Sequence, residues 1–214
     1  MKFADLVATV AGLPVFRGSL LLSGDRDPAD VRRQLARWQA SGRIVQLRRN
    51  VYALAEPWRR IEPHPFVIAN ELHVPSYVSL QSALSWHGLI PEAVPVTTSV
   101  TTGRPAEFRT ALGQYLYRHI HGEVFFGYSR VAVLDDQEAF VADPAKALLD
   151  LVYLTPGGDA DEYLESLRLS RLEALDEQTL RRHAGRWGKR KILRATDAIL
   201  RIKRSSGESG GPDS

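Results

Sequence analysis

Few side chains in this sequence are spaced as metal-binding or catalytic groups would be. His119 and His121 lie two residues apart in a predicted strand, which would place both rings on one face as possible metal ligands. The chain has no cysteine and no obvious third ligand, so two partly exposed strand histidines are the alternative interpretation. Asp135 and Asp136 resemble a carboxylate pair, but they lie between two predicted strands, where Asp is common in turns. We expect the acid pair to be structural.

Lys146 and Asp150 lie four residues apart on a predicted helix that Asp143 and Pro144 begin, a spacing that lets them pair across one turn. The apolar neighbours of Asp150 favour a partly buried, structural pair, and a functional surface is the alternative. The sequence contains no P-loop, Rossmann glycine pattern, GxSxG or HExxH. It therefore predicts neither an enzyme nor a bound metal or cofactor.

The composition is that of a globular protein with a real core. The 214 residues are 44% hydrophobic and 25% charged, and the absence of cysteine excludes disulfides and thiol chemistry. Asp5 interrupts the N-terminus before any long apolar run, so no secretory signal is expected. The longest uncharged stretch, residues 72–91, is too polar to span a bilayer. These features fit a cytoplasmic protein.

The net charge of +3 hides an uneven distribution. Residues 1–60 carry 11 Lys and Arg against 5 Asp and Glu, whereas residues 61–155 carry 5 against 10 and residues 156–214 carry 12 against 10. A basic N-terminal third beside an acidic middle is typical of a nucleic-acid-binding module joined to a different domain.

The N-terminal third predicts three helices followed by a hairpin. The first helix covers residues 2–11, an apolar segment at residues 15–22 supplies the second, and Asp27 with Pro28 begins a third that runs to about Ser41. Val31, Leu35 and Trp38 form one stripe of this third helix, so its alanines and arginines lie opposite. Taken alone, this basic side fits a solvated charged face as well as a DNA-binding one.

A basic hairpin favours the DNA-binding interpretation. Two β-prone runs, residues 44–47 and 51–54, flank Arg48, Arg49 and Asn50, and Asn50 can adopt the left-handed conformation of a turn. Three helices and such a hairpin are the order of a winged helix-turn-helix. The predicted DNA-binding residues are Arg26, Arg32, Arg33, Arg37, Arg48, Arg49 and Asn50. A winged helix that is only structural is the alternative.

The overall prediction is an α+β protein: an N-terminal winged helix-turn-helix, then a mixed α/β domain with a helical C-terminal end. The predicted boundaries are 1–58 for the DNA-binding domain, 59–204 for the mixed domain and 205–214 for a disordered, Ser/Gly-rich tail. The last helices are expected at residues 161–170, 176–184 and 189–203.

Several short motifs in one order resemble the AbiEi family, the antitoxin and transcriptional-regulator half of abortive-infection type IV toxin–antitoxin pairs. The resemblance covers about the first 155 residues, and its motifs are residues 49–52 (RNVY), 77–84 (YVSLQSAL), 87–90 (HGLI), 125–127 (FFG) and 142–150 (ADPAKALLD). The chain departs from the family pattern at Asn50, where Gly is usual, and at Ala145, where Glu is usual. A role that depends on that glutamate cannot be carried over.

The resemblance implies a cytoplasmic, autoregulating repressor that binds inverted repeats in its own promoter, which requires two protomers on the DNA. It also implies that the C-terminal domain counteracts a nucleotidyltransferase-like toxin. Candidate residues for this antitoxin function are Lys146, Asp150, Lys189, Arg190, Lys191 and Arg194. The last four belong to a basic amphipathic helix that fits a solvated surface, a second DNA contact or a docking face for an acidic partner. The rival hypothesis is an antitoxin that binds its toxin directly and uses the winged helix only as a scaffold.

Overall fold

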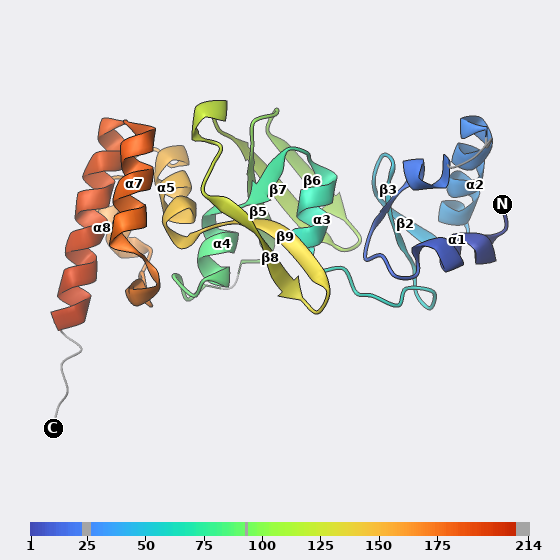
Figure 1. Cartoon of the computed structure of the whole chain (residues 1–214), viewed down its shortest axis with the longest axis horizontal. Helices are drawn as coiled ribbons and strands as arrows, with labels where there is room; N and C mark the ends of the chain where they lie inside the picture. Colours follow the sequence, from blue (N-terminus) through green and yellow to red (C-terminus); the bar gives the residue numbers. More distant parts are fainter. Residues whose placement is uncertain (23–26, 93, 209–214) are drawn as a thin grey trace, which may run out of the picture.

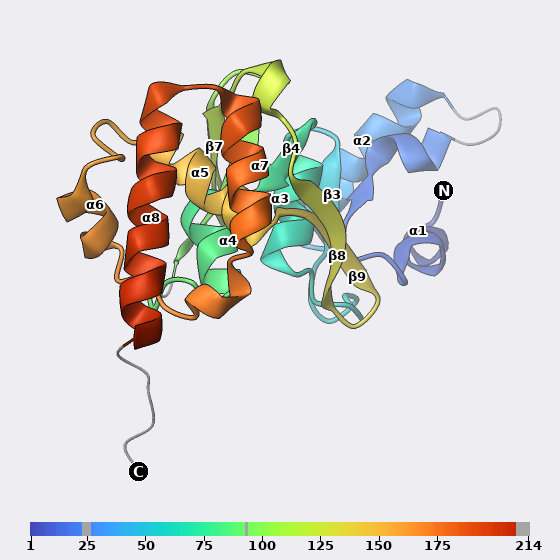
Figure 2. The same ribbon diagram turned by 60° about the vertical axis from the view of Figure 1, so that its left-hand side comes forward.

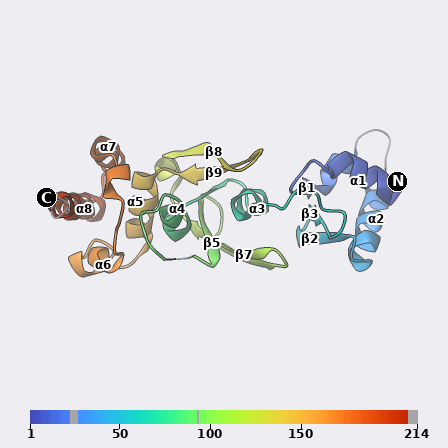
Figure 3. The same ribbon diagram turned by 90° about the horizontal axis from the view of Figure 1, so that it is seen from below.

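The chain is a mixed α+β protein built in three parts along one long axis. The computed structural model describes residues 1–22, 27–92 and 94–208. A small N-terminal unit lies at one end, a six-stranded sheet lies in the middle, and helices form the other end (Figures 1 and 3). Of the residues that the structure describes, no helix is long and apolar enough to cross a membrane.

The N-terminal unit combines helices with a three-stranded antiparallel sheet of order β1-β3-β2. Its elements are α1 (Phe3–Val10), β1 (Phe16–Arg17), the 3₁₀ helix η1 (Gly18–Leu22), α2 (Pro28–Ala40), β2 (Ile44–Arg48) and β3 (Val51–Leu54). Residues 15–22, predicted as a second helix, instead form β1 and η1. Phe16 and Arg17 pair with Tyr52 and Val51 of β3, and the five residues left before the next loop are too few for a stable α-helix.

The sheet of the N-terminal unit packs on both faces. One face joins the small core beneath α1 and α2, where Tyr52 and Leu54 meet Leu35 and Trp38. The other face, which includes Leu47, Val51 and Ala53, is continuous with the larger core of the central sheet. Alternate residues of a strand point to opposite faces, so one short hairpin serves both cores.

The central sheet has the strand order β6-β7-β5-β4-β9-β8. Neighbouring strands are antiparallel except for the pairs β4/β9 and β5/β7. The strands are β4 (Ser76–Val78), β5 (Val96–Thr101), β6 (Ala106–Thr110), β7 (Gly113–His119), β8 (Tyr128–Leu134) and β9 (Gln137–Ala142). Helix α3 (Pro65–Leu72) precedes β4, and α4 (Leu80–Trp86) and the 3₁₀ helix η2 (Gly122–Val124) lie between strands.

The C-terminal end is helical. It comprises α5 (Pro144–Leu154), α6 (Asp161–Ser166), η3 (Leu172–Ala174), α7 (Glu177–Trp187) and α8 (Arg190–Glu208), and α7 and α8 lie side by side across α5 (Figure 2). Because α8 continues to Glu208, the helix covers the first four residues of the stretch predicted as a disordered tail. Ser206 Oγ donates to the Ile202 carbonyl at 2.9 Å, a contact within the helix that accommodates this serine. The remaining tail residues, 209–214, lie outside the described part of the chain.

Candidate functional site

Helix α2 presents the predicted basic face to solvent. Asp27 caps the helix by accepting from the Ala29 amide at 2.9 Å, and Pro28 occupies the first helical position. Val31, Leu35 and Trp38 are buried, whereas Arg32, Arg33 and Arg37 are exposed, as are Ala36 and Ala40 between them. The helical periodicity therefore predicted the exposed side of α2 correctly.

The three arginines of α2 are largely free of intramolecular partners. Arg33 forms an exposed ion pair with Asp30, one turn earlier on the same helix. Within the described residues, the side chains of Arg32 and Arg37 form no ion pair or hydrogen bond. An exposed ion pair contributes little stability, so all three guanidinium groups are available to an anionic partner.

The turn between β2 and β3 lies beside the N-terminal half of α2. Asn50 has φ = 66°, the left-handed conformation predicted for it, and its carbonyl accepts from the Gly18 amide at 3.1 Å. Arg49 is exposed and has no hydrogen bond or ion pair among the described residues. Arg32, Arg49 and Asn50 line one hollow of about 330 Å³ together with residues of η1. The turn thus adds a cation beside the basic face of α2. We call Arg32, Arg33, Arg37 and Arg49 the arginine surface.

We leave Arg48, which the sequence predicts as a DNA contact, out of the arginine surface because its guanidinium has partners within the protein. Its Nη1 donates to the Leu72 carbonyl at the end of α3, and its guanidinium carbon lies 4.9 Å from the centre of the Phe108 ring. Both partners belong to the central part of the molecule, so Arg48 fastens the hairpin to that part. Arg17 acts similarly through an ion pair with Glu71 at 2.8 Å. Arg26, also predicted to contact DNA, lies outside the described residues.

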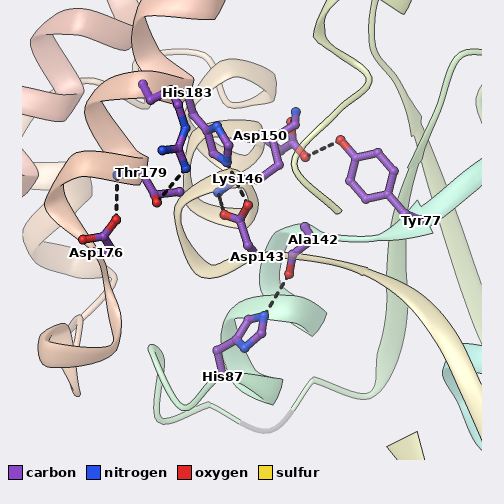
Figure 4. A network of polar contacts seen from close by, with 10 residues as sticks. Tyr77, His87, Ala142, Asp143, Lys146, Asp150, Asp176, Thr179 and His183 are labelled. Atoms are coloured by element: carbon purple, nitrogen blue, oxygen red, sulfur yellow. Dashed lines mark hydrogen bonds and ion pairs between the residues drawn. The ribbon is translucent and has the colours of Figure 1, made fainter. Parts of the chain in front are cut away.

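Lys146 and Asp150 form the centre of a buried polar network (Figure 4). The Lys146 ammonium pairs with Asp150 Oδ1, and both side chains are fully buried. Tyr77 Oη and Ser79 Oγ donate to Asp150 Oδ2 at 3.0 and 2.7 Å. The sequence predicted this pair by its spacing but not the two hydroxyl groups, which come from β4 and from the residue that follows it.

A second pair of polar groups connects the same region to α7. Asp143 caps α5 by accepting from the Lys146 amide at 2.8 Å, and its other carboxylate oxygen accepts from His183 Nε2 at 2.8 Å. We call Tyr77, Ser79, Asp143, Lys146, Asp150 and His183 the Lys146 cluster. It joins the sheet, α5 and α7 at one point (Figure 4).

Burial dominates the electrostatics of the Lys146 cluster. Burial lowers the pKa of Lys146 and raises the pKa of Asp150. The Asp150 charge acts to raise the pKa of Lys146, and the Lys146 charge acts to lower the pKa of Asp150, but burial is the larger cause in both cases. Burial together with the Asp150 charge raises the pKa of the Tyr77 hydroxyl, which stays a neutral donor. The Lys146 ammonium also lies 4.7 Å from the centre of the Trp187 ring and 5.0 Å from that of Phe126. Because Lys146 and Asp150 are closed to solvent, they cannot form an antitoxin surface and instead hold helices and sheet together.

Most cations of the basic helix α8 are paired within the molecule. Arg194 Nε donates to Asp159 at 2.9 Å, and Lys191 donates to the Tyr153 carbonyl at 3.3 Å and to the Thr155 carbonyl. The side chains of Lys189 and Arg190 are exposed and form no hydrogen bond or ion pair with any described residue. Of the four antitoxin candidates near α8, only these two are available to a partner without breaking an existing contact.

The histidine and acid pairs do not form a catalytic arrangement. His119 is the last residue of β7 and its Nδ1 bonds to the Gly103 carbonyl oxygen at 2.8 Å, whereas His121 lies beyond the strand, before η2. The two therefore do not share a strand face as predicted, because β7 ends one residue before Ile120. Asp135 and Asp136 form the turn between β8 and β9, as predicted. No group of three or more possible metal ligands occurs among the described residues.

The sequence matches no protein-family model and no curated protein. The resemblance to the AbiEi family therefore stays a prediction, and the arrangement of the residues carries the functional argument.

Proposed function

We propose that residues 1–58 form a winged helix that binds duplex DNA, with α2 in the major groove and the β2–β3 turn beside it. The order of elements supports this assignment: a helix, a short strand, a short 3₁₀ helix, a helix and a hairpin. The observation that carries the proposal is the arginine surface, in which exposed guanidinium groups have few intramolecular partners.

The chemistry of this surface suits DNA. A guanidinium fork pairs with phosphate oxygens or with the N7 and O6 atoms of guanine, and the major groove admits an α-helix. Ala36 and Ala40 lie on the same exposed side of α2, where their short side chains let the backbone approach the bases closely. Arg33 would exchange Asp30 for a DNA group on binding. Arg49 supplies a phosphate contact from the hairpin turn.

We further propose that the protein is a cytoplasmic, non-enzymatic antitoxin that represses its own operon by binding inverted repeats as two protomers. Its remaining residues would counteract a nucleotidyltransferase-like toxin. This part rests on the motifs that resemble the AbiEi family and on the different charge of residues 61–155, which suggests a partner other than DNA. Lys189 and Arg190 are the antitoxin candidates that the structure leaves accessible.

Binding of the protein to a DNA fragment from its own promoter tests the proposal. Arg33→Ala and Arg37→Ala should each weaken binding by ~1–3 kcal/mol if they read base edges. Arg109→Ala is the matched control, because Arg109 is an exposed arginine of β6 whose one ion pair among the described residues is with Glu107. A reporter fused to the same promoter should lose repression with Arg33→Ala and with Arg37→Ala but keep it with Arg109→Ala. Unchanged affinity in both α2 variants would contradict the assignment.

One observation favours a second candidate, a protein that neutralises a toxin by direct contact and uses the N-terminal unit as a scaffold. The β2–β3 hairpin packs against the central part, and Arg48 is occupied there. Co-purification with the product of the neighbouring gene distinguishes the two functions. A stable equimolar complex without any promoter binding would support the second candidate, whereas promoter binding by the isolated chain supports the first.

A further inference from the structure

A cavity of about 520 Å³ lies between the central sheet and the helices that cover it. Its walls come from α4, from the segment that leads into β5, from β5 and β7, and from the C-terminal parts of α5 and α6. This volume is within the range of small-molecule sites in proteins. The lining of the cavity shares no residue with the arginine surface or with the Lys146 cluster.

The walls of the cavity are mainly apolar. Leu80, Ile90 and Leu151 are buried, and they form the inner wall together with the half-buried Val96, Leu116 and Leu154. Aliphatic side chains that remain partly open to solvent around a concave site favour the burial of an apolar molecule.

Two polar groups in the cavity have unused hydrogen-bonding capacity. The side-chain amide of the half-buried Gln81 forms no hydrogen bond with any described residue. Arg118 Nη2 donates to the Leu154 carbonyl at 3.2 Å, but within the described part of the chain its guanidinium pairs with no carboxylate. The other charged residue of the lining, Glu92, is neutralised by an ion pair with Arg168, which lowers the pKa of Glu92. The unbalanced charge facing the cavity is therefore positive.

The backbone of Leu80 supports a functional interpretation of this wall. Leu80 has φ = 58°, a left-handed conformation that bulky L-residues rarely adopt. Ser79, the preceding residue, is held by its hydrogen bond to Asp150. Such conformations persist where surrounding contacts impose them, and they are concentrated at ligand sites.

We propose that this cavity binds a small amphipathic carboxylic acid, with its apolar chain against the leucine wall and its carboxylate on the Arg118 guanidinium. The charge selects an anion over a neutral or cationic head group, and the apolar wall selects for chain length. A guanidinium can hold a carboxylate through two parallel hydrogen bonds. This site goes beyond the proposed function, which makes no use of the cavity.

Calorimetric titration of the full chain with hexanoate, octanoate, octan-1-ol and octylamine tests the proposal. Octanoate should bind with one molecule per chain, roughly tenfold more tightly than hexanoate because it buries two more methylene groups. It should also bind at least about fivefold more tightly than octan-1-ol, because a charge-assisted hydrogen bond is stronger than a neutral one. Octylamine should bind most weakly. No saturable binding of octanoate, or tighter binding of octylamine, would overturn the proposal.

Two variants assign the binding to this cavity. Arg118→Gln should abolish the preference for octanoate over octan-1-ol, and Arg109→Gln, the matched control outside the cavity, should preserve it. Leu116→Trp should fill the cavity and remove binding of both molecules, with circular dichroism reporting whether each variant is folded. If Arg118→Gln retains the preference, the carboxylate site is wrong. If folded Leu116→Trp binds octanoate as the original chain does, binding occurs elsewhere and the cavity proposal fails.

Discussion

Replacement of Lys146 by methionine tests the role of the buried network in detail. The change keeps a long apolar side chain against Trp187 and Phe126 but removes the only cation paired with Asp150 among the described residues. The Asp150 carboxylate then stays fully buried with two hydroxyl donors, from Tyr77 and Ser79. Removing one partner of a buried ion pair costs about 3–5 kcal/mol, so we expect the free energy of unfolding to fall by that amount at pH 7.

The pH dependence of this loss has a defined sign. Burial already raises the pKa of Asp150, and Lys146 opposes that rise. In the folded Lys146→Met variant, the Asp150 carboxyl therefore has a higher pKa than in the unfolded chain and binds a proton at a higher pH. The free energy of unfolding falls as pH rises through the pKa of Asp150 in the folded variant. The difference in unfolding free energy between the two proteins should be smaller at pH 5 than at pH 7.

Urea denaturation followed by tryptophan fluorescence and circular dichroism measures these differences. The double variant Lys146→Met/Asp150→Leu should cost less than Lys146→Met alone, because it leaves no uncompensated charge. Arg130→Met is the matched control, since Arg130 forms an exposed pair with Glu138 at 2.9 Å and should cost under about 1 kcal/mol. A loss below about 1 kcal/mol in Lys146→Met, or a double variant as unstable as the sum of its single variants, would refute this reasoning.

Three further predictions concern single positions. Asn50→Ala should lower the free energy of unfolding by about 1 kcal/mol and Asn50→Gly should be nearly neutral, because φ is positive there; equal losses in urea denaturation would contradict this. Arg48→Ala should also lower the free energy of unfolding by about 1 kcal/mol while leaving the salt dependence of DNA binding unchanged. A shallower salt dependence in this variant would show that Arg48 contacts DNA. His64 Nδ1 accepts from the Phe66 amide at 3.2 Å, and burial lowers the pKa of His64. Because the unfolded chain then binds the proton more readily than the folded chain, the free energy of unfolding should fall as pH drops from 7 to 5. Denaturation at both pH values should show a weaker pH dependence in His64→Asn than in His121→Asn, and identical profiles would contradict this.

Features set by neighbouring residues were predictable from the sequence. Asp27 with Pro28 and Asp143 with Pro144 begin helices as predicted, because a cap depends on residues two or three positions away. The exposed side of α2 followed from helical periodicity, and the left-handed Asn50 followed from turn preferences.

Features set by distant residues were not predictable. Residues 15–22 were wrongly predicted as a helix because the partner strand of β1 lies about thirty-five residues later in the chain. The contacts of Arg48 with Leu72 and Phe108 were not predicted because both partners are remote in the sequence. The spacing of Lys146 and Asp150 indicated a pair, but the complete burial of both depends on the sheet and on α7.

The salt dependence of promoter binding tests the arginine surface most directly. If each of the four guanidinium groups of the arginine surface contacts a phosphate, the logarithm of the binding constant should fall against the logarithm of salt concentration with a slope of about −3.6 per protomer. Removing Arg32, Arg33 and Arg37 together should leave a slope of about −0.9 per protomer, whereas Lys189→Ala/Arg190→Ala should keep the original slope. Equal slopes for the original chain and the triple α2 variant would contradict DNA binding through this surface.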